Sequence, residues 1–155
     1  TFDDEVRVWQ QLRHPNVLKL YGACDVGLDL LFFVCEYASQ GSLLEYVKSS
    51  SVEKSAMWRY LHEAALGLEY LHERDLVHGD LRCSNILIGS DCNAKLSNFG
   101  LSGSAKRFRV TSGEGVNSTR WQAPEVVKGE SPAYESDVYS LGMCILEAST
   151  KKRPW

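Results

Sequence analysis

The chain has 155 residues, a formal net charge of −3 and 44% hydrophobic residues, a composition typical of globular proteins and not of disordered or fibrous ones. Its acidic balance and scattered Lys and Arg residues give no basic patch for nucleic acid. No apolar run approaches the roughly 18 residues that cross a bilayer. We therefore expect no nucleic-acid partner and no direct membrane contact from this segment.

The five cysteines stand at wide spacings, and no two of them form a Cys-x-x-Cys pair. An odd number in this pattern argues against both a disulfide framework and a zinc knuckle. We expect free thiols in a reducing interior. The predicted location is intracellular and cytoplasmic, including the cytoplasmic part of a larger receptor or multidomain protein.

The first predicted elements are a helix and a hairpin. From Phe2 to Leu12 apolar residues recur every three or four positions, and His14 and Pro15 end the pattern. The runs VLKLYGAC (17–24) and LLFFVCEY (30–37) are rich in β-forming residues and are separated by turn formers. They predict an antiparallel hairpin.

Two capping boxes predict the next two helices. Ser42 and Glu45 form a Ser-x-x-Glu box before LLEYV, and Ser50 and Glu53 repeat it before a helix that runs to about His72. The second helix carries an apolar stripe and should face the core. The stripe consists of Met57, Leu61, Ala64, Ala65, Leu68 and Leu71.

The second half of the chain predicts a hairpin, a long loop and a helix. Residues 86–88 and 94–96 are short β-rich runs joined by Gly-Ser-Asp-Cys-Asn, which is typical of a turn. Residues 101–119 lack periodicity, and a loop of this length is usually functional. SDVYSLGMCILEAS (136–149) predicts a buried helix with Ser136 as its N-cap.

Three short strings in chain order carry the functional signal. HGDLRCSN (78–85), NFG (98–100) and APE (123–125) resemble the protein-kinase motifs His-Arg-Asp with its following Asn, Asp-Phe-Gly and Ala-Pro-Glu. SDVYSLG (136–142) is similar to the start of the buried central helix of that family. Each string alone is weak, but their order and intervals make the whole chain resemble a protein kinase domain.

The resemblance implies an α+β, protein-kinase-like fold of two lobes. Residues 1–36 would form part of the N-lobe, namely helix C and a strand pair. Residues 37–155 would form the hinge and part of a mainly helical C-lobe, with the catalytic loop, the activation loop and helix F. The glycine-rich loop and the strand lysine of the family are absent from the sequence, so we expect a partial domain that ends after helix F.

The resemblance also assigns the catalytic and metal-binding residues. Asp80 matches the residue that orients the substrate hydroxyl and accepts its proton. Arg82 stands where serine/threonine kinases usually carry a lysine, and it keeps the positive charge near the transferred phosphate. Asn85 and Asn98 match the two magnesium ligands. The cofactors implied are ATP and Mg²⁺.

A second set of residues matches the adenine site of the family. Cys35 falls at the gatekeeper position, and the backbone groups of Glu36 and Ala38 would bond adenine from the hinge. Leu87 matches the residue below the adenine ring. Glu5 matches the helix C glutamate that pairs with the strand lysine. The plain alternative for Cys35 is a buried thiol that acts as a small hydrophobe.

Four further residues match the stack of side chains that links the two lobes in this family, and the alternative is that they are ordinary core residues. The stack is anchored by an aspartate of the central helix. Its members here are Trp9, Leu20, His78 and Phe99, anchored by Asp137.

Two positions favour Ser or Thr of protein substrates as the phosphate acceptor. Arg82 differs from the tyrosine-kinase pattern, and Ser118 sits where serine/threonine kinases place a threonine. LFFVCEYASQGSLLEYV and DVYSLGMCILE nevertheless look close to tyrosine kinases. This combination is typical of the tyrosine-kinase-like group. Gly79 replaces the family's arginine, so phosphorylation of the activation loop should matter less for activity.

Asn98 is the largest departure, because the family has an aspartate there. The amide lacks a full negative charge against a dication, a loss of roughly 2 to 5 kcal/mol after screening, or about 30-fold to several thousand-fold in rate if realised at the transition state. Two hypotheses stay open. The first is an ATP-dependent serine/threonine kinase, and the second is a pseudokinase that acts as a nucleotide- or partner-binding signalling scaffold.

Overall fold

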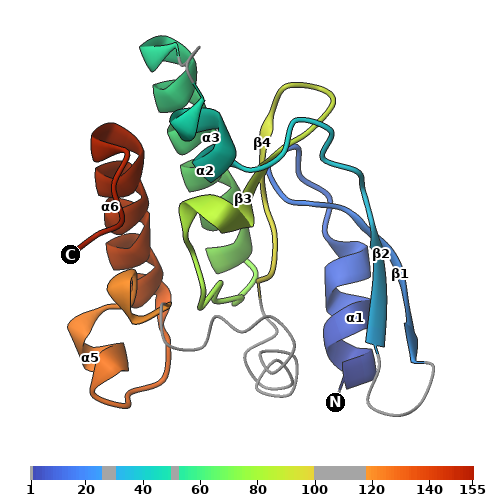
Figure 1. Cartoon of the computed structure of the whole chain (residues 1–155). Helices are drawn as coiled ribbons and strands as arrows, with labels where there is room; N and C mark the ends of the chain where they lie inside the picture. Colours follow the sequence, from blue (N-terminus) through green and yellow to red (C-terminus); the bar gives the residue numbers. More distant parts are fainter. Residues whose placement is uncertain (1, 26–30, 50–52, 100–117) are drawn as a thin grey trace.

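The computed structural model describes residues 2–25, 31–49, 53–99 and 118–155 (Figure 1). One strand pair and one helix lie at one side of the molecule, and most of the helices lie at the other, with a second strand pair between them. This arrangement confirms the predicted α+β fold. No helix in the described ranges is long and apolar enough to span a membrane.

The N-terminal side consists of helix α1 (Phe2–Gln11) and a hairpin of β1 (Leu20–Asp25) and β2 (Leu31–Cys35). The strands are antiparallel, and Leu20 pairs with Cys35. Trp9 of α1 packs on the hairpin, with its ring centroid 5.7 Å from that of Phe33. The helix and the hairpin expected from the sequence are therefore confirmed.

The segment after α1 connects this side to the rest of the molecule through backbone hydrogen bonds with β4 (Ala94–Leu96). The Leu96 amide donates to the Asn16 carbonyl at 2.9 Å, and the Leu18 amide donates to the Leu96 carbonyl at 2.9 Å. The buried Asn16 side chain donates to the Ala94 carbonyl at 2.9 Å. These bonds fix the position of α1 relative to the second hairpin.

Helix α2 (Leu43–Lys48) begins with the predicted capping box. The Ser42 amide donates to Glu45 Oε2 at 2.6 Å, and the Glu45 amide donates to Ser42 Oγ at 3.3 Å. The hydrogen bond from the Ser42 amide lowers the pKa of the Glu45 carboxyl, so the box is held by a charged acceptor.

Helix α3 (Lys54–His72) begins later than its predicted capping box requires. Glu53 is the N-cap, with extended backbone angles and no side-chain cap bond, and its amide donates to Tyr46 Oη at 3.3 Å. The prediction that Glu53 sits inside the first turn was therefore wrong, and Ser50 lies outside the described residues. The apolar stripe is confirmed, because every member is buried except the half-buried Ala65.

The predicted second hairpin is formed by β3 (Ile86–Ile88) and β4, with Leu87 opposite Lys95. The 3₁₀ helix η1 (Cys83–Asn85) leads into β3. Most of the predicted loop 101–119 lies outside the described residues, but its end was misassigned. Ser118 and Thr119 belong to the 3₁₀ helix η2 (Ser118–Arg120), which is followed by the short helix α5 (Pro124–Val127).

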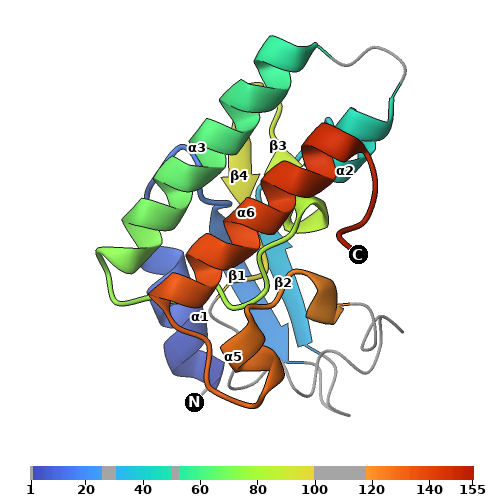
Figure 2. The ribbon, with the colours of Figure 1, turned by 90° about the vertical axis from the view of Figure 1, so that its left-hand side faces the viewer.

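Helix α6 (Tyr134–Thr150) lies beside α3 (Figure 2). Its N-cap is Ala133, so the prediction of Ser136 as N-cap was wrong. Ser136 instead occupies the third helical position, where its Oγ accepts from the Ala133 amide at 2.9 Å. The expectation of a buried apolar helix was also wrong in part. Val138 is 60% exposed, while Asp137 and Glu147 are buried, because loops bring hydrogen-bond donors to those carboxylates.

The close approach of α3 to the segment after α1 depends on Gly67. A Cβ at this position would lie 2.4 Å from the Asn16 carbonyl oxygen, which is backbone and is itself bonded to Leu96. A side chain there must push α3 away from the connection between the two sides of the molecule.

We predict that Gly67→Ala lowers the free energy of unfolding by about 1 to 3 kcal/mol, because overpacking outweighs the gain in helix propensity. Gly142→Ala in α6 is the matched control, since a Cβ there meets nothing within 4 Å, and it should be neutral or stabilising by up to about 1 kcal/mol. Urea unfolding of the protein that contains this chain measures both values. Equal effects of the two substitutions would contradict the close contact.

Candidate active site

The predicted catalytic loop, residues 78–85, is attached to α6 by one buried carboxylate. Asp137 is 1% exposed. Its Oδ2 accepts from the His78 amide at 2.7 Å, and its Oδ1 accepts from the Gly79 amide at 2.8 Å. His72 Nε2 lies 2.9 Å from Oδ2. Both oxygens are therefore used in fixing the start of the loop.

Gly79 has a φ of 77°, in the left-handed region that favours glycine. With this backbone angle, the Gly79 amide donates to Asp137 Oδ1 at 2.8 Å. The glycine that departs from the family motif therefore suits the turn that the loop makes.

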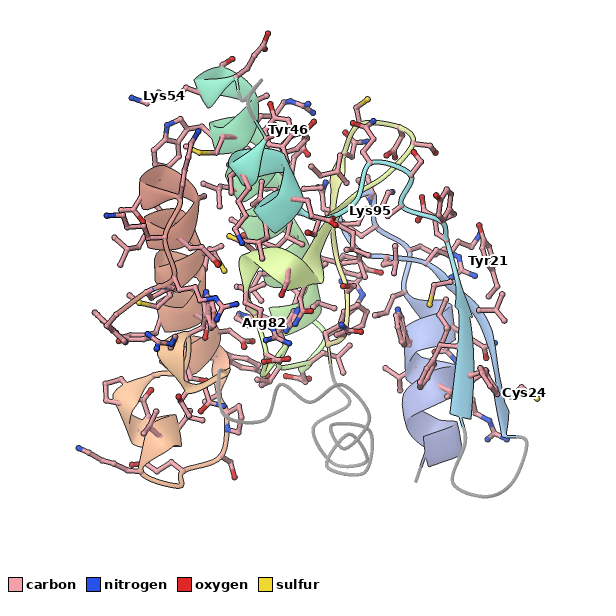
Figure 3. All side chains as sticks on the ribbon, viewed as in Figure 1. Tyr21, Cys24, Tyr46, Lys54, Arg82 and Lys95 are labelled. Atoms are coloured by element: carbon pink, nitrogen blue, oxygen red, sulfur yellow. The ribbon has the colours of Figure 1, made fainter. Side chains whose placement is uncertain are left out.

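Asp80 and Asn85 face each other across the loop. Asn85 Nδ2 donates to the Asp80 carbonyl at 2.7 Å and to Asp80 Oδ2 at 3.2 Å. Arg82 Nη2 lies 3.8 Å from the same carboxylate oxygen, and Figure 3 shows Arg82 in the lower middle of the molecule. The Asp80 side chain is 23% exposed. The carboxylate is thus held by neighbours and remains accessible to another molecule.

The segment that follows β4 brings Asn98 to Asn85. The amide and the hydroxyl of Ser97 both donate to the Asn85 carbonyl, at 3.0 and 2.9 Å. Asn98 has a φ of 59°, a left-handed conformation that Asn and Asp tolerate better than other side chains. Its Nδ2 donates to Asn85 Oδ1 at 3.0 Å.

The direction of this amide pair follows from Asp80. Because Asn85 Nδ2 is used by the carbonyl and carboxylate of Asp80, Asn85 must present its oxygen to Asn98. Asn98 therefore donates to this oxygen from its side-chain nitrogen. An aspartate at position 98 has no hydrogen to donate there, so the pair is a consequence of the amide.

The two amides allow a test of the fit to Mg²⁺. Magnesium prefers hard oxygens and usually one or two carboxylates. If the exposed side-chain amide of Asn98 rotates by half a turn, its oxygen takes the place of its nitrogen. The side-chain oxygens of Asn98 and Asn85 then lie next to each other, and both are hard ligands. The pair fits the ion in ligand type and position but brings no negative charge. The described residues hold no group of three or more His, Cys, Asp or Glu suited to a metal.

The predicted stack is present as a line of contacts across the molecule. The ring centroids of Trp9 and Phe99 are 5.0 Å apart, and those of His78 and Phe99 are 6.1 Å apart. Leu20 is buried in the same core cluster. Burial lowers the pKa of His78, and its Nδ1 accepts from the Asp80 amide at 3.2 Å. A neutral His78 therefore supports the catalytic loop.

The predicted hinge follows β2 directly. The Glu36 amide donates to the Lys19 carbonyl at 2.8 Å, and the Ala38 carbonyl accepts from the Gly41 amide at 3.3 Å. Cys35 is half-buried, and burial raises the pKa of its thiol. This supports its interpretation as a small hydrophobe.

The two remaining residues assigned to the adenine site lie in different parts of the fold. Leu87 is the half-buried central residue of β3. Glu5 lies in α1, and its side chain is outside the described part.

Comparison with known proteins identifies the family. The family model for protein tyrosine and serine/threonine kinases matches residues 1–155. This chain belongs to the protein kinase family. The resemblance inferred from the three motifs is thereby confirmed.

Three relatives of this kinase segment are protein kinases by name, and two of them are named serine/threonine-protein kinases. A probable serine/threonine-protein kinase of Dictyostelium discoideum is 36% identical over 159 residues, which covers 99% of this chain and 10% of that protein. Serine/threonine-protein kinase CTR1 of Arabidopsis thaliana is 36% identical, with coverage of 97% and 19%. Mitogen-activated protein kinase kinase kinase 1 of Arabidopsis thaliana is 33% identical, with coverage of 99% and 25%. The chain thus spans a quarter or less of these relatives.

Sequence reasoning missed one buried carboxylate of the kinase site. Glu147 is 2% exposed. Its Oε2 accepts from Trp121 Nε1 at 3.0 Å and lies 3.4 Å from the amide nitrogen of Cys83 in the catalytic loop. Its only sequence signal is a charge in the apolar second half of the helix, ten residues after Asp137. Helix α6 therefore holds the catalytic loop at two places.

We predict that Asp137→Asn lowers the free energy of unfolding of this kinase by about 2 to 4 kcal/mol, because an amide nitrogen then faces a buried backbone donor. Glu135→Gln, an exposed change in the first turn of the same helix, should cost no more than about 0.5 kcal/mol. Thermal and urea unfolding of both variants measure this difference. Equal stability would show that the Asp137 bonds contribute nothing.

Proposed function

We propose that the protein containing this chain is an ATP-dependent protein kinase that transfers phosphate to Ser or Thr of protein substrates. The observation that carries this proposal is the Asp80 carboxylate, which is accessible and is held by the Asn85 side chain at 3.2 Å from Oδ2 and 2.7 Å from the carbonyl. Such a fixed carboxylate suits a group that must orient a hydroxyl before transfer.

Three residues of the chain have separate roles in the proposed phosphate transfer. In the proposed transfer Asp80 orients the substrate hydroxyl and accepts its proton, while the phosphoryl group separates from ADP and bonds to the hydroxyl oxygen. Asn85 holds Asp80 in place. Arg82, whose guanidinium lies 3.8 Å from Asp80, offers a positive charge to the transferred group.

Backbone groups of Glu36 and Ala38 in the hinge would bind the adenine of ATP, and Leu87 and Cys35 would contribute apolar contacts to it. The Glu5 carboxylate in α1 would pair with the lysine that the family supplies from a strand. Asn85 and Asn98 would hold the Mg²⁺ ion. When bound, this ion neutralises charge on the phosphates.

Two observations support Ser or Thr as the acceptor. Two of the three relatives named above are serine/threonine-protein kinases by name. Arg82 and Ser118 match the pattern of those enzymes and not that of tyrosine kinases. The described cysteines are all free, which supports an intracellular location for the signalling role.

One specific observation favours the second candidate function, a pseudokinase scaffold that binds nucleotide or a partner without transfer. The hydrogen bond from Asn98 Nδ2 to Asn85 Oδ1 at 3.0 Å satisfies the ligand oxygen without an ion. In a kinase with aspartate at this position two oxygens face each other and need a cation between them. The amide pair removes that need.

We predict that Asn98→Asp raises the rate of transfer from ATP at least 30-fold if the native protein is a weak enzyme, because it restores one charge against Mg²⁺. Asp80→Asn should lower the native rate about 10²-fold or more through loss of the proton acceptor. Asp75→Asn, in a turn outside the site, is the matched control and should leave the rate unchanged. The assay measures magnesium-dependent phosphorylation of a generic protein substrate by the full-length protein.

The outcomes separate the two candidates. Native activity that disappears in Asp80→Asn supports the kinase. Native activity at background that appears only in Asn98→Asp supports the pseudokinase. Activity that survives Asp80→Asn contradicts the assigned role of the catalytic loop.

A further inference from the structure

Lys95 is a buried cation outside the catalytic loop that sequence reasoning did not single out. It occupies the middle of β4, and its side chain is 5% exposed. Its Nζ donates to the Pro15 carbonyl at 3.0 Å and lies 3.1 Å from Glu36 Oε1 and 3.1 Å from Asp91 Oδ2. An ammonium group has three hydrogens to donate, so each finds an acceptor.

This arrangement keeps Lys95 charged. Burial would lower the pKa of its ammonium, but the hydrogen bonds and charges of Asp91 and Glu36 outweigh burial and raise the pKa. A buried charge costs free energy unless it is paired and fully hydrogen-bonded. The three acceptors meet that condition, and removal of the cation would leave two carboxylates beside each other.

The three acceptors come from three different segments. Pro15 belongs to the connection after α1, Glu36 is the first residue after β2, and Asp91 lies in the turn between β3 and β4. Lys95 therefore ties the start of the hinge to the hairpin that carries Asn98, which is three residues further along the chain.

The other end of the hinge is fixed to the same hairpin independently of Lys95. The Gln40 amide donates to the Ile88 carbonyl at 3.2 Å, and the Ile88 amide donates to the Gly41 carbonyl at 2.8 Å. Residues 37–39, which include Ala38, thus span two fixed points. The Lys95 contact to Glu36 is a side-chain attachment at the first of them.

Gly89 leaves the space through which the lysine side chain passes. A Cβ at Gly89 would lie 2.6 Å from Lys95 Cε and 2.6 Å from Asp91 Oδ1. The glycine and the lysine therefore form one structural unit at the end of β3. A substitution at Gly89 therefore displaces the Lys95 side chain without altering its charge.

We propose that Lys95 is a positioning residue for the adenine nucleotide, which it serves by holding Glu36 and with it the hinge backbone that faces adenine. The inference rests on the proposed nucleotide site. It concerns how the hinge is placed and assigns Lys95 no contact with the nucleotide. Loss of the cation removes the side-chain attachment of Glu36 and leaves the backbone bond to the Lys19 carbonyl, so the binding groups of residues 36–38 are held less firmly in one arrangement.

The test compares Lys95→Met, Glu36→Gln and the double variant in the full-length protein, with the exposed Lys48→Met as matched control. Calorimetry with a non-hydrolysable ATP analogue measures the Kd, and steady-state kinetics measure KM for ATP and kcat separately. We expect Lys95→Met to raise Kd and KM about 10-fold with kcat changed less than twofold. The double variant should be no weaker than Lys95→Met, because both changes break one interaction.

The opposite results overturn the proposal. An unchanged Kd in Lys95→Met, or equal falls in kcat and kcat/KM with KM constant, would show that Lys95 only stabilises the fold. If Lys95→Met does not fold, Glu36→Gln and Gly89→Ala, which displaces the lysine, test the same contact. Each should raise the Kd at least threefold, and an unchanged Kd in both contradicts the proposal.

A second readout separates this inference from the proposed function. If the native protein binds no ATP analogue, the proposed nucleotide site is wrong. Hydrogen exchange of the nucleotide-free protein then tests separately whether Lys95 positions the hinge. We expect Lys95→Met to speed exchange of the Glu36 amide, which donates to the Lys19 carbonyl, at least 10-fold and to leave the His78 amide unchanged. Equal rates at Glu36 overturn the positioning role.

Discussion

The carboxylate of Asp137 is the interaction on which the catalytic loop depends. It is almost fully buried, and its oxygens accept two consecutive backbone amides and adjoin a histidine of α3. A buried carboxylate is costly unless it is satisfied in this way. The loop that satisfies it carries Asp80 and Asn85, so the bonds that satisfy Asp137 in the core also fix the loop that presents the Asp80 carboxylate to solvent. Glu147 repeats the arrangement further along α6, at the end of the loop.

The contacts that extend from the loop held by Asp137 lead to Asn98, a position that lacks the negative charge of an aspartate. Ser97 attaches the segment after β4 to Asn85, which in turn holds Asp80. Asn98 then sits beside Asn85 and completes a hydrogen bond where the kinase family has a carboxylate. The backbone conformation suits either residue, and the difference is electrostatic. The chain therefore combines a firmly held Asp80–Asn85 pair with an uncharged side chain at position 98, which we propose weakens the attraction for a dication.

Much of the fold could be predicted because local patterns determine it. The two hairpins and the stripe of α3 follow from periodicity and turn residues. The starts of α3 and α6 were misplaced because Glu53 and Ser136 have more than one possible hydrogen-bond partner, and tertiary contacts choose among them. The kinase motifs that contain the proposed catalytic residues were recognisable from their order. The roles of Lys95 and Glu147 could not be predicted, because their hydrogen-bond partners come from segments that are distant in the sequence. No local pattern reveals such partners.

Hydrogen exchange at the His78 and Gly79 amides tests the central claim most directly, that a buried carboxylate preforms the catalytic loop without nucleotide or metal. Measured on nucleotide-free protein in the presence of a chelator, both amides should exchange at least about 10³-fold more slowly than an unstructured peptide, since opening them requires unfolding of the loop from α6. Rates close to those of the peptide, or protection that arises only when nucleotide is added, would contradict the account.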